Sequence, residues 1–213
     1  MEILIVGATR EAYELIAELR KAGHKIILAD DDEKRSREFS KSPFDIAIHT
    51  LDPLDYYQLR EIGLTNADAV IALHPSDAVN VAVCVYARKL NVPKIIAVFS
   101  EGSIGDALVE MGISGASVTR GREIARSVLE SLFDVKITDL GNYYLVVIDS
   151  MKKDAVVGMS IEEIEEKVGK TIAILDREGN RVERRRDETI ARGEVLLVLV
   201  PREGAIKALN SLT

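Results

Sequence analysis

The sequence has little of several features that mark particular classes of protein. Cys84 is its only cysteine among 213 residues, which excludes an internal disulfide framework and a metal site built from several cysteines. No apolar stretch approaches the roughly 18 residues that cross a bilayer, and the longest, such as 195–200, have the length of a buried strand. The first residues show neither a basic segment nor a small-residue cleavage site. We therefore expect a cytoplasmic protein without direct membrane insertion.

Basic charge is scarce as well. The chain has 28 Lys+Arg against 35 Asp+Glu, a net charge of −7, and neither half is the basic body that a nucleic-acid backbone requires. The one cationic run, Arg184-Arg185-Arg186, lies between acidic residues and is typical of a solvated turn. No nucleic-acid partner is expected. Glutamine occurs once while Glu, Lys and Arg are abundant, a usage typical of proteins from hot environments.

The first 134 residues alternate short apolar runs with segments of helical periodicity. Apolar residues such as Tyr13, Ile16 and Leu19 recur at the spacing of a helix with one buried face. The strand candidates are continuous apolar runs, as expected for strands covered on both faces. They are residues 2–6, 25–29, 45–49, 69–73, 94–99 and 116–119. These repeats predict a doubly wound, parallel-sheet α/β domain of Rossmann-like type over residues 1–134.

The pattern changes after a last helical segment at residues 121–134. Three β-rich runs follow, at 142–149, 171–176 and 194–200, and Glu178-Gly179-Asn180 is a hairpin turn signal. Ser160 and Glu163 have capping-box spacing at the start of a short acidic helix, 160–167, and a terminal helix is expected at 202–212. We therefore predict a linker at 135–139 and a small α+β domain at 140–213, of a size that often dimerises.

Residues Gly7-Ala8-Thr9-Arg10-Glu11 follow the first strand and open the first helix. This is the setting of the dinucleotide-binding fingerprint, which needs a tight turn, a bare backbone beside the pyrophosphate, and a small residue where helix meets strand. Gly7 meets the first need and Ala12 the third, but the branched Thr9 stands where the second glycine belongs. Backbone N–H groups at the helix N-terminus still attract an anion. The motif predicts the fold and leaves the ligand open.

Three aspartates end the second strand, where this fold places the carboxylate that binds ribose hydroxyls. Asp30 is the first candidate for that role and Asp31 the second. The alternative is that Asp31 and Asp32 cap the following helix. Three carboxylates favour a plain ribose over one with a 2′-phosphate, because they repel the additional charge.

Other chemistry is sparse. His74 follows the fourth strand beside the first turn, where contact with a ligand and a structural role are equal alternatives. No Cys or His partner stands at ligand spacing, so no metal site is expected. Cys84 falls on an apolar helical face and is expected to pack in the core. We find no catalytic constellation and expect a protein that is not an enzyme.

These residues together resemble the regulatory potassium-conductance family, the TrkA-type or KTN/RCK proteins, over nearly the whole chain. The resemblance rests on Gly7-Ala8-Thr9-Arg10, Leu28-Ala29-Asp30-Asp31-Asp32, Ser76-Asp77-x-x-Asn80, Val157-Gly158-x-Ser160-Ile161 and Asp187-Glu188-Thr189-Ile190-x-x-Gly193-Glu194. The sequence departs from the family at Thr9 and Ala12, which replace glycines, at Leu51 and Leu54 beside Asp52, and at Val98, where the family commonly has arginine.

The resemblance implies a cytosolic, ligand-sensing regulatory subunit of a membrane potassium transporter or channel, peripheral to the inner face of the membrane through that partner. It implies a C-terminal domain of TrkA-C (RCK-C) type and homo-oligomers, as dimers, tetramers or octameric rings. The implied cofactor is NAD(H) or an adenine nucleotide such as ATP or ADP. The implied cofactor-binding residues are Gly7, Ala8, Thr9, Arg10, Glu11, Asp30, Asp31, Asp52 and His74.

Two other functions remain open from the sequence. An NAD-dependent oxidoreductase shares the fold and Asp30 but lacks an acid/base set here. A nucleotide-free assembly scaffold for another ion transporter accounts for the departures from the family in the cleft. The sequence does not decide between the nucleotides, the membrane partners, the ring sizes or the directions of regulation.

Overall fold

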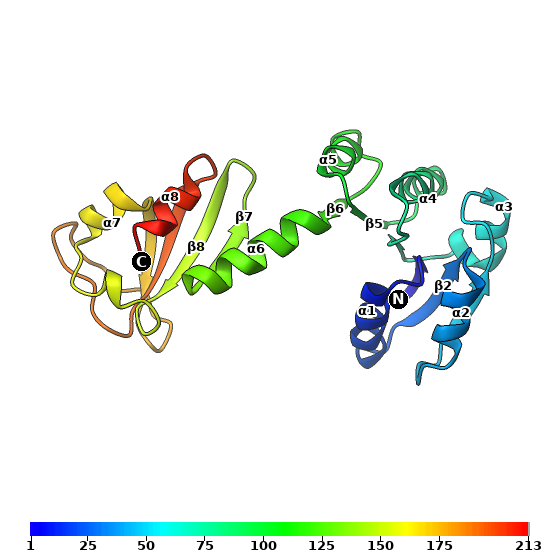
Figure 1. Cartoon of the computed structure of the whole chain (residues 1–213), viewed down its shortest axis with the longest axis horizontal. Helices are drawn as coiled ribbons and strands as arrows, with labels where there is room; N and C mark the ends of the chain where they lie inside the picture. The colour runs from blue at the N-terminus through cyan, green and yellow to red at the C-terminus, as the bar shows by residue number, and fades with distance from the viewer. Residues whose placement is uncertain (213) are drawn as a thin grey trace. The chain divides into compact units, whose positions relative to one another are not determined.

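The computed structural model describes residues 1–212, which form two compact units. The first unit covers Met1–Glu123 and the second begins at Ile124. In Figure 1 they run from blue to green and from green to red. Within residues 1–212, no helix combines the length and the apolar character needed to cross a membrane.

The first unit alternates strands with helices along its whole length. Its elements are β1 (Glu2–Val6), α1 (Arg10–Lys21), β2 (Lys25–Asp30), α2 (Glu33–Ser40), β3 (Ala47–Thr50), α3 (Tyr56–Leu59), a π-helical turn η1 (Arg60–Leu64), β4 (Ala69–Ala72), α4 (Asp77–Lys89), β5 (Lys94–Phe99), α5 (Gly102–Glu110), β6 (Ala116–Thr119) and the start of α6 (Arg120–Phe133).

The six strands form one parallel sheet in the order β3-β2-β1-β4-β5-β6. Strand β1 lies in the middle, where Leu4 is opposite Ile27 of β2 and Val70 of β4. The chain moves outward in one direction from β1 to β3 and in the other from β4 to β6. The crevice at the carboxyl ends of β1 and β4 is therefore the switch point at which open α/β sheets bind ligands. The predicted doubly wound fold is confirmed.

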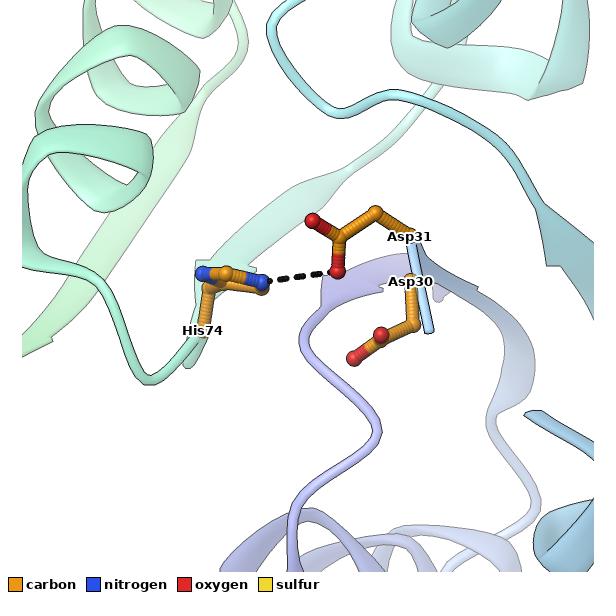
Figure 2. Close-up of side chains that lie close together, drawn as sticks. All are labelled: Asp30, Asp31 and His74. Carbon is orange, nitrogen blue, oxygen red and sulfur yellow. Dashed lines mark hydrogen bonds and ion pairs between the residues drawn. The ribbon is translucent and has the colours of Figure 1, made fainter. Parts of the chain in front are cut away.

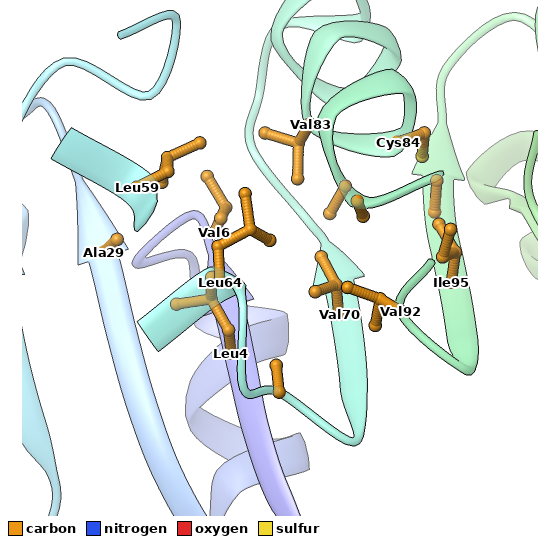
Figure 3. Close-up of a cluster of buried hydrophobic side chains, with 14 of the residues drawn as sticks. Leu4, Val6, Ala29, Leu59, Leu64, Val70, Val83, Cys84, Val92 and Ile95 are labelled. Atoms are coloured by element: carbon orange, nitrogen blue, oxygen red, sulfur yellow. The ribbon is translucent and has the colours of Figure 1, made fainter. Parts of the chain in front are cut away.

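Both faces of this sheet are covered, which explains why the strands are continuous apolar runs. Leu4 and Val6 pack in a cluster with residues of α3, η1 and α4, whereas Ile3 and Ile5 pack with residues of α1 and α2. Figure 3 shows the first cluster, in which Cys84 of α4 lies among the strand side chains. Burial raises the pKa of the Cys84 thiol to about 12, so this cysteine packs as a small apolar residue.

The second unit contains a smaller, antiparallel sheet in the order β7-β8-β10-β9. Val146 of β8 and Val198 of β10 pack in its core with Ile164 and Leu209 of the helices. The predicted small α+β domain is confirmed, and the capping box of Ser160 and Glu163 is present. The elements are β7 (Val135–Asp139), β8 (Tyr143–Asp149), a 3-10 turn η2 (Asp154–Val156), α7 (Ile161–Lys167), β9 (Lys170–Leu175), β10 (Val195–Pro201) and α8 (Ala205–Asn210).

The main difference from the sequence-based prediction lies at the border between the two units. Residues 135–139, which we predicted as a linker, form strand β7 and pair with β8 from Val135 to Asp139. Only Val135 and Ile137 are buried in this strand, and two apolar side chains are too few to separate a strand from a linker by pattern. The terminal helix is shorter than predicted because Gly204, with φ of +85°, stands just before α8. Thr213, the last residue of the predicted second domain, lies outside the described residues.

Candidate functional site

The turn after β1 runs close to the end of β4. Gly7 has φ of +118°, and a Cβ added there would lie 2.5 Å from the backbone nitrogen of His74. The N–H of Leu73 donates to the carbonyl of Val6 at 2.7 Å, and the N–H of Gly7 donates to that of Ala29 at 2.8 Å. Three strand ends therefore converge on Gly7, and the backbone alone requires a glycine before any ligand is considered.

The first turn of α1 retains donors for an anion. Thr9 is the N-cap residue, and its Oγ1 accepts the N–H of Ala12 at 3.2 Å. Among residues 1–212, no acceptor is found for the backbone N–H of Arg10 or of Glu11. Free N–H groups and the positive end of the helix dipole make this terminus attractive to a phosphate.

Two other helix starts differ from α1 because a carboxylate lies at each of them. Asp32 caps α2 and accepts two backbone N–H groups of its first turn. Asp77 accepts the N–H groups of Ser100 and Glu101, which immediately precede α5. An anion approaching the carboxyl edge of the sheet would meet negative charge at both places.

Asp30 is fully buried at the end of β2, and both of its carboxylate oxygens are engaged. Oδ2 accepts the N–H of Ala8 at 2.6 Å, and Oδ1 accepts the N–H of Asp32 at 2.7 Å. Arg35 of α2 donates to Oδ1 through Nη2 at 2.7 Å and through Nε at 3.1 Å. A ribose hydroxyl would therefore reach Asp30 only if Arg35 moved away.

The charge state of Asp30 follows from these contacts. Burial by itself would raise the pKa of this carboxyl, but the hydrogen bond from Arg35 and those from Ala8 and Asp32 outweigh burial and hold the pKa below its ordinary value. The same hydrogen bond raises the pKa of Arg35. The pair is therefore ionised, and it ties helix α2 to the β1–α1 turn.

His74 lies two residues beyond β4, with its ring buried beside Asp31. Its Nδ1 accepts the N–H of Ser76 at 3.1 Å, which places the ring proton of a neutral imidazole on Nε2. Nε2 then donates to Oδ1 of Asp31 at 3.1 Å, as Figure 2 shows. Arg35 donates to the same oxygen at 3.0 Å. Asp31 is half exposed and is thus the most accessible carboxylate of this cluster.

Asp31, Asp32, Arg35 and His74 line an open depression of about 610 Å³ together with Pro75 and Ser76. Asp30, Asp31 and His74 place three potential metal ligands within 4.8 Å of one another. The Arg35 guanidinium, however, already bonds to both carboxylates, and Nε2 of His74 carries its proton. The atoms that could coordinate a metal are therefore already engaged, the two carboxylates by Arg35 and Nε2 by its own proton.

The structure brings together most of the residues that the sequence predicted, but not all of them. Gly7, Ala8, Asp30, Asp31 and His74 meet at the switch point through the contacts given above. Asp52 is exposed, and its Oδ1 accepts the N–H of Leu54 at 2.9 Å. Asp52 thus stabilises the turn after β3 and does not line the depression beside Asp31.

Two residues at the site were missed as participants. Asn80 is fully buried; its Oδ1 accepts the N–H of His74, and its Nδ2 donates to the carbonyls of His74 and Val98, each at 2.8 Å. It therefore joins the ends of β4 and β5. Arg35 was missed because an arginine in the first turn of a charged helix is normally solvated. The available signal was its position five residues after a buried acidic strand end.

Comparison with known proteins assigns the first unit to a family. Residues 3–118 match the model of the TrkA-N domain. The chain belongs to the TrkA-N domain family. The match contains the β1–α1 turn, Asp30, Asp31 and His74, and it ends within β6.

Two curated relatives of this TrkA-N protein carry the same description. A Trk system potassium uptake protein TrkA homolog from Methanothermobacter thermautotrophicus is 25% identical over 218 residues, which cover all of both chains. A homolog from Pyrococcus abyssi is 33% identical over 98 residues, or 46% of this chain and 42% of the relative. The match therefore covers less than half of the Pyrococcus abyssi protein.

Solved structures of the channel GsuK share the TrkA-N fold. GsuK bound to NAD is 20% identical, with a TM-score of 0.60, over 99% of this chain and 38% of that chain. GsuK bound to ADP is 25% identical, with a TM-score of 0.54, over 61% of this chain and 34% of that chain. The present chain spans about a third to two fifths of these proteins.

Proposed function

We propose that this TrkA-N protein is a ligand-sensing regulatory subunit of a membrane potassium transporter or channel, rather than an enzyme. The observation that carries the proposal is its similarity, along all of both chains, to a Trk potassium uptake protein homolog. The protein would act at the inner face of the membrane through its partner. The first unit, Met1–Glu123, would bind the ligand, and the second unit, which begins at Ile124, would contribute to assembly.

The ligand we propose is an adenine nucleotide or NAD(H), bound at the switch point of the first sheet. Its phosphates would accept hydrogen bonds from the backbone N–H groups of Arg10 and Glu11, which lack acceptors within residues 1–212. Its ribose would face the depression beside Asp31, Arg35 and His74. The solved structure of GsuK bound to ADP supports this class of ligand, because GsuK is 25% identical to this chain over the matched region.

A 2′-phosphate is not expected on that ribose, although an arginine stands beside it. Arginine accommodates the 2′-phosphate of NADP in related folds, but Arg35 here is surrounded by Asp30, Asp31 and Asp32, at 2.7, 3.0 and 3.3 Å. Three carboxylates around one guanidinium leave net negative charge. NAD should therefore bind more tightly than NADP.

The proposed mechanism is linkage between ligand binding and the shape of an oligomer. A nucleotide that binds one conformation of the assembly better than another shifts the population toward that conformation, and a complete switch from 1:99 to 99:1 needs a preference of about 10⁴-fold. Coupling among several subunits lets each site contribute only part of that preference. Light scattering that finds a strict monomer, with and without nucleotide, would rule out this mechanism.

Thermal unfolding of the full chain with NAD, NADH, NADP, ATP, ADP and AMP tests the ligand. A ligand at 100 times its Kd should stabilise the protein by about 2.7 kcal/mol. We expect Arg10→Ala to reduce the shift because it removes a cation from the α1 terminus, whereas Arg37→Ala should leave it unchanged, since Arg37 pairs with Glu33 on the exposed side of α2. A panel without any shift would refute nucleotide binding.

A further inference from the structure

A second arginine approaches the start of α1 from the opposite end of the sheet. Arg120 follows β6, and its Nη1 donates to Oγ of Ser100, which follows β5, at 3.3 Å. Its Nε lies 3.6 Å from Oε1 of Glu11 in the first turn of α1. The side chain thus reaches along the carboxyl ends of the strands to the helix terminus whose N–H groups are free.

The contacts of Arg120 leave its guanidinium incompletely satisfied. Its Nε is shielded from solvent and has no hydrogen-bond partner within residues 1–212, because 3.6 Å to Glu11 is too long for a hydrogen bond. A shielded donor without an acceptor costs free energy that an incoming acceptor recovers. The Glu11 carboxylate is more than half exposed and can turn toward water.

The position of Arg120 relative to the ribose end of the site indicates which part of a ligand it meets. Asp31 and Arg35 lie on the β2 side of the α1 terminus, whereas Arg120 comes from the β6 side. A 5′-monophosphate bound at the helix terminus would lie between these two sides. A phosphoryl group beyond the first one would extend toward Arg120.

We propose that Arg120 binds the second phosphoryl group of a 5′-diphosphate, either ADP or the pyrophosphate of a dinucleotide. When the site is empty, the Glu11 carboxylate takes the position of that phosphoryl group beside Arg120. This inference rests on the proposed nucleotide site, and it adds that the site prefers a 5′-diphosphate to a 5′-monophosphate. Glu11, predicted from the sequence as a cofactor-binding residue, then competes with the ligand. Arginine suits this role because charge-assisted hydrogen bonds to phosphate are short and strong.

The test is calorimetric titration of the full chain and its variants with adenosine, AMP and ADP. In the wild type, ADP should bind more tightly than AMP. Arg120→Ala should weaken ADP binding about tenfold, the effect of losing one charge-assisted hydrogen bond, and should leave AMP and adenosine binding unchanged. Glu11→Gln should strengthen ADP binding severalfold, because it removes the competing charge.

Matched variants separate this role from a general effect on the fold. Arg122 lies in the same helical turn as Arg120 and pairs with Asp106 of α5. Arg122→Ala should not change the preference for ADP. Arg120→Lys keeps the charge without the planar donor pair and should fall between wild type and Arg120→Ala. If wild-type protein binds ADP and both Arg120 variants bind it equally well, the role of Arg120 is refuted while the nucleotide site stands. If no nucleotide binds the wild type, the proposed function fails, and this inference with it.

Discussion

The buried carboxylate of Asp30 gives the most specific prediction about stability. Asp30→Asn preserves the shape of the side chain but replaces one acceptor oxygen with an NH₂ group. That group must then face either the N–H of Ala8 or the donors of Asp32 and Arg35. A donor will oppose a donor in either orientation, and Arg35 will lose its buried counter-charge.

The size of the effect follows from burial. Asp30 is 0% exposed while Arg35 is 31% exposed, and removal of one partner from a buried pair typically costs about 3–5 kcal/mol. The asparagine still accepts one set of hydrogen bonds, so we expect roughly 3 kcal/mol at pH 7. Asp31→Asn is the matched control, because Asp31 pairs with the same arginine but is 50% exposed; it should cost less than about 1 kcal/mol.

The pH dependence has a definite sign. The folded pKa of Asp30 lies below the ordinary value of 3.8, so its contribution to stability is fully present well above pH 3.8 and is lost as the pH falls through the folded pKa. Asparagine does not titrate. The stability difference between wild type and Asp30→Asn should therefore be constant near neutral pH and shrink in acid.

Amide hydrogen exchange followed by NMR is the suitable assay, because it reports on each unit of the chain separately. Protection of the β1, β2 and β4 amides should fall in Asp30→Asn by a factor that corresponds to about 3 kcal/mol, while the β8 and β10 amides should be unaffected. Equal protection in wild type and variant at pH 7 would refute the account of this network.

Three further predictions concern single residues of the first unit. Gly7→Ala should destabilise it by roughly 3–5 kcal/mol, measured by chemical denaturation, because the new Cβ would lie 2.5 Å from the backbone of His74 and Leu73; a loss below 1 kcal/mol would contradict the tight approach. Asn80→Ala should cost about 3 kcal/mol, since three backbone groups of His74 and Val98 lose their partner; a neutral result would mean that water replaces the amide. Cys84 should resist a thiol reagent at pH 8 until the protein unfolds, because the thiol is buried and its pKa is raised to about 12; labelling of the folded protein at the rate of free cysteine would exclude this burial.

The fold of the first unit was predictable because each strand is an apolar run with a helical segment after it. The strand at 94–99 and that at 116–119 agree with β5 and β6 residue by residue. Strand β7 escaped prediction because Lys136 and Thr138 face away from the core and interrupt a short run. Its pairing with β8 depends on tertiary context, which a local pattern does not contain.

The location of the site in the fold was predictable from the sequence, but the side-chain contacts within it were not. Asp30 was expected at the end of β2, and there its Oδ2 accepts the N–H of Ala8 in the β1–α1 turn. The roles predicted for Asp30 and Asp31 toward a ribose stay predictions. The pairing of Asp30 with Arg35 was not predictable, because it depends on the direction of α2. That direction brings Arg35, five positions later in the sequence, back to the end of β2. The link from Arg120 to Glu11 joins residues 109 positions apart in the sequence, and no spacing rule connects them.

The central claim is that a nucleotide phosphate binds the free donors at the start of α1, and the most direct measurement is NMR titration of the full chain with ADP and with NAD. The account predicts that the backbone amides of Arg10 and Glu11 shift most as ligand is added, while the amide of Ala8, held by Asp30 at 2.6 Å, shifts less. Absence of any shift in the β1–α1 turn, or shifts confined to residues after Ile124, would contradict it.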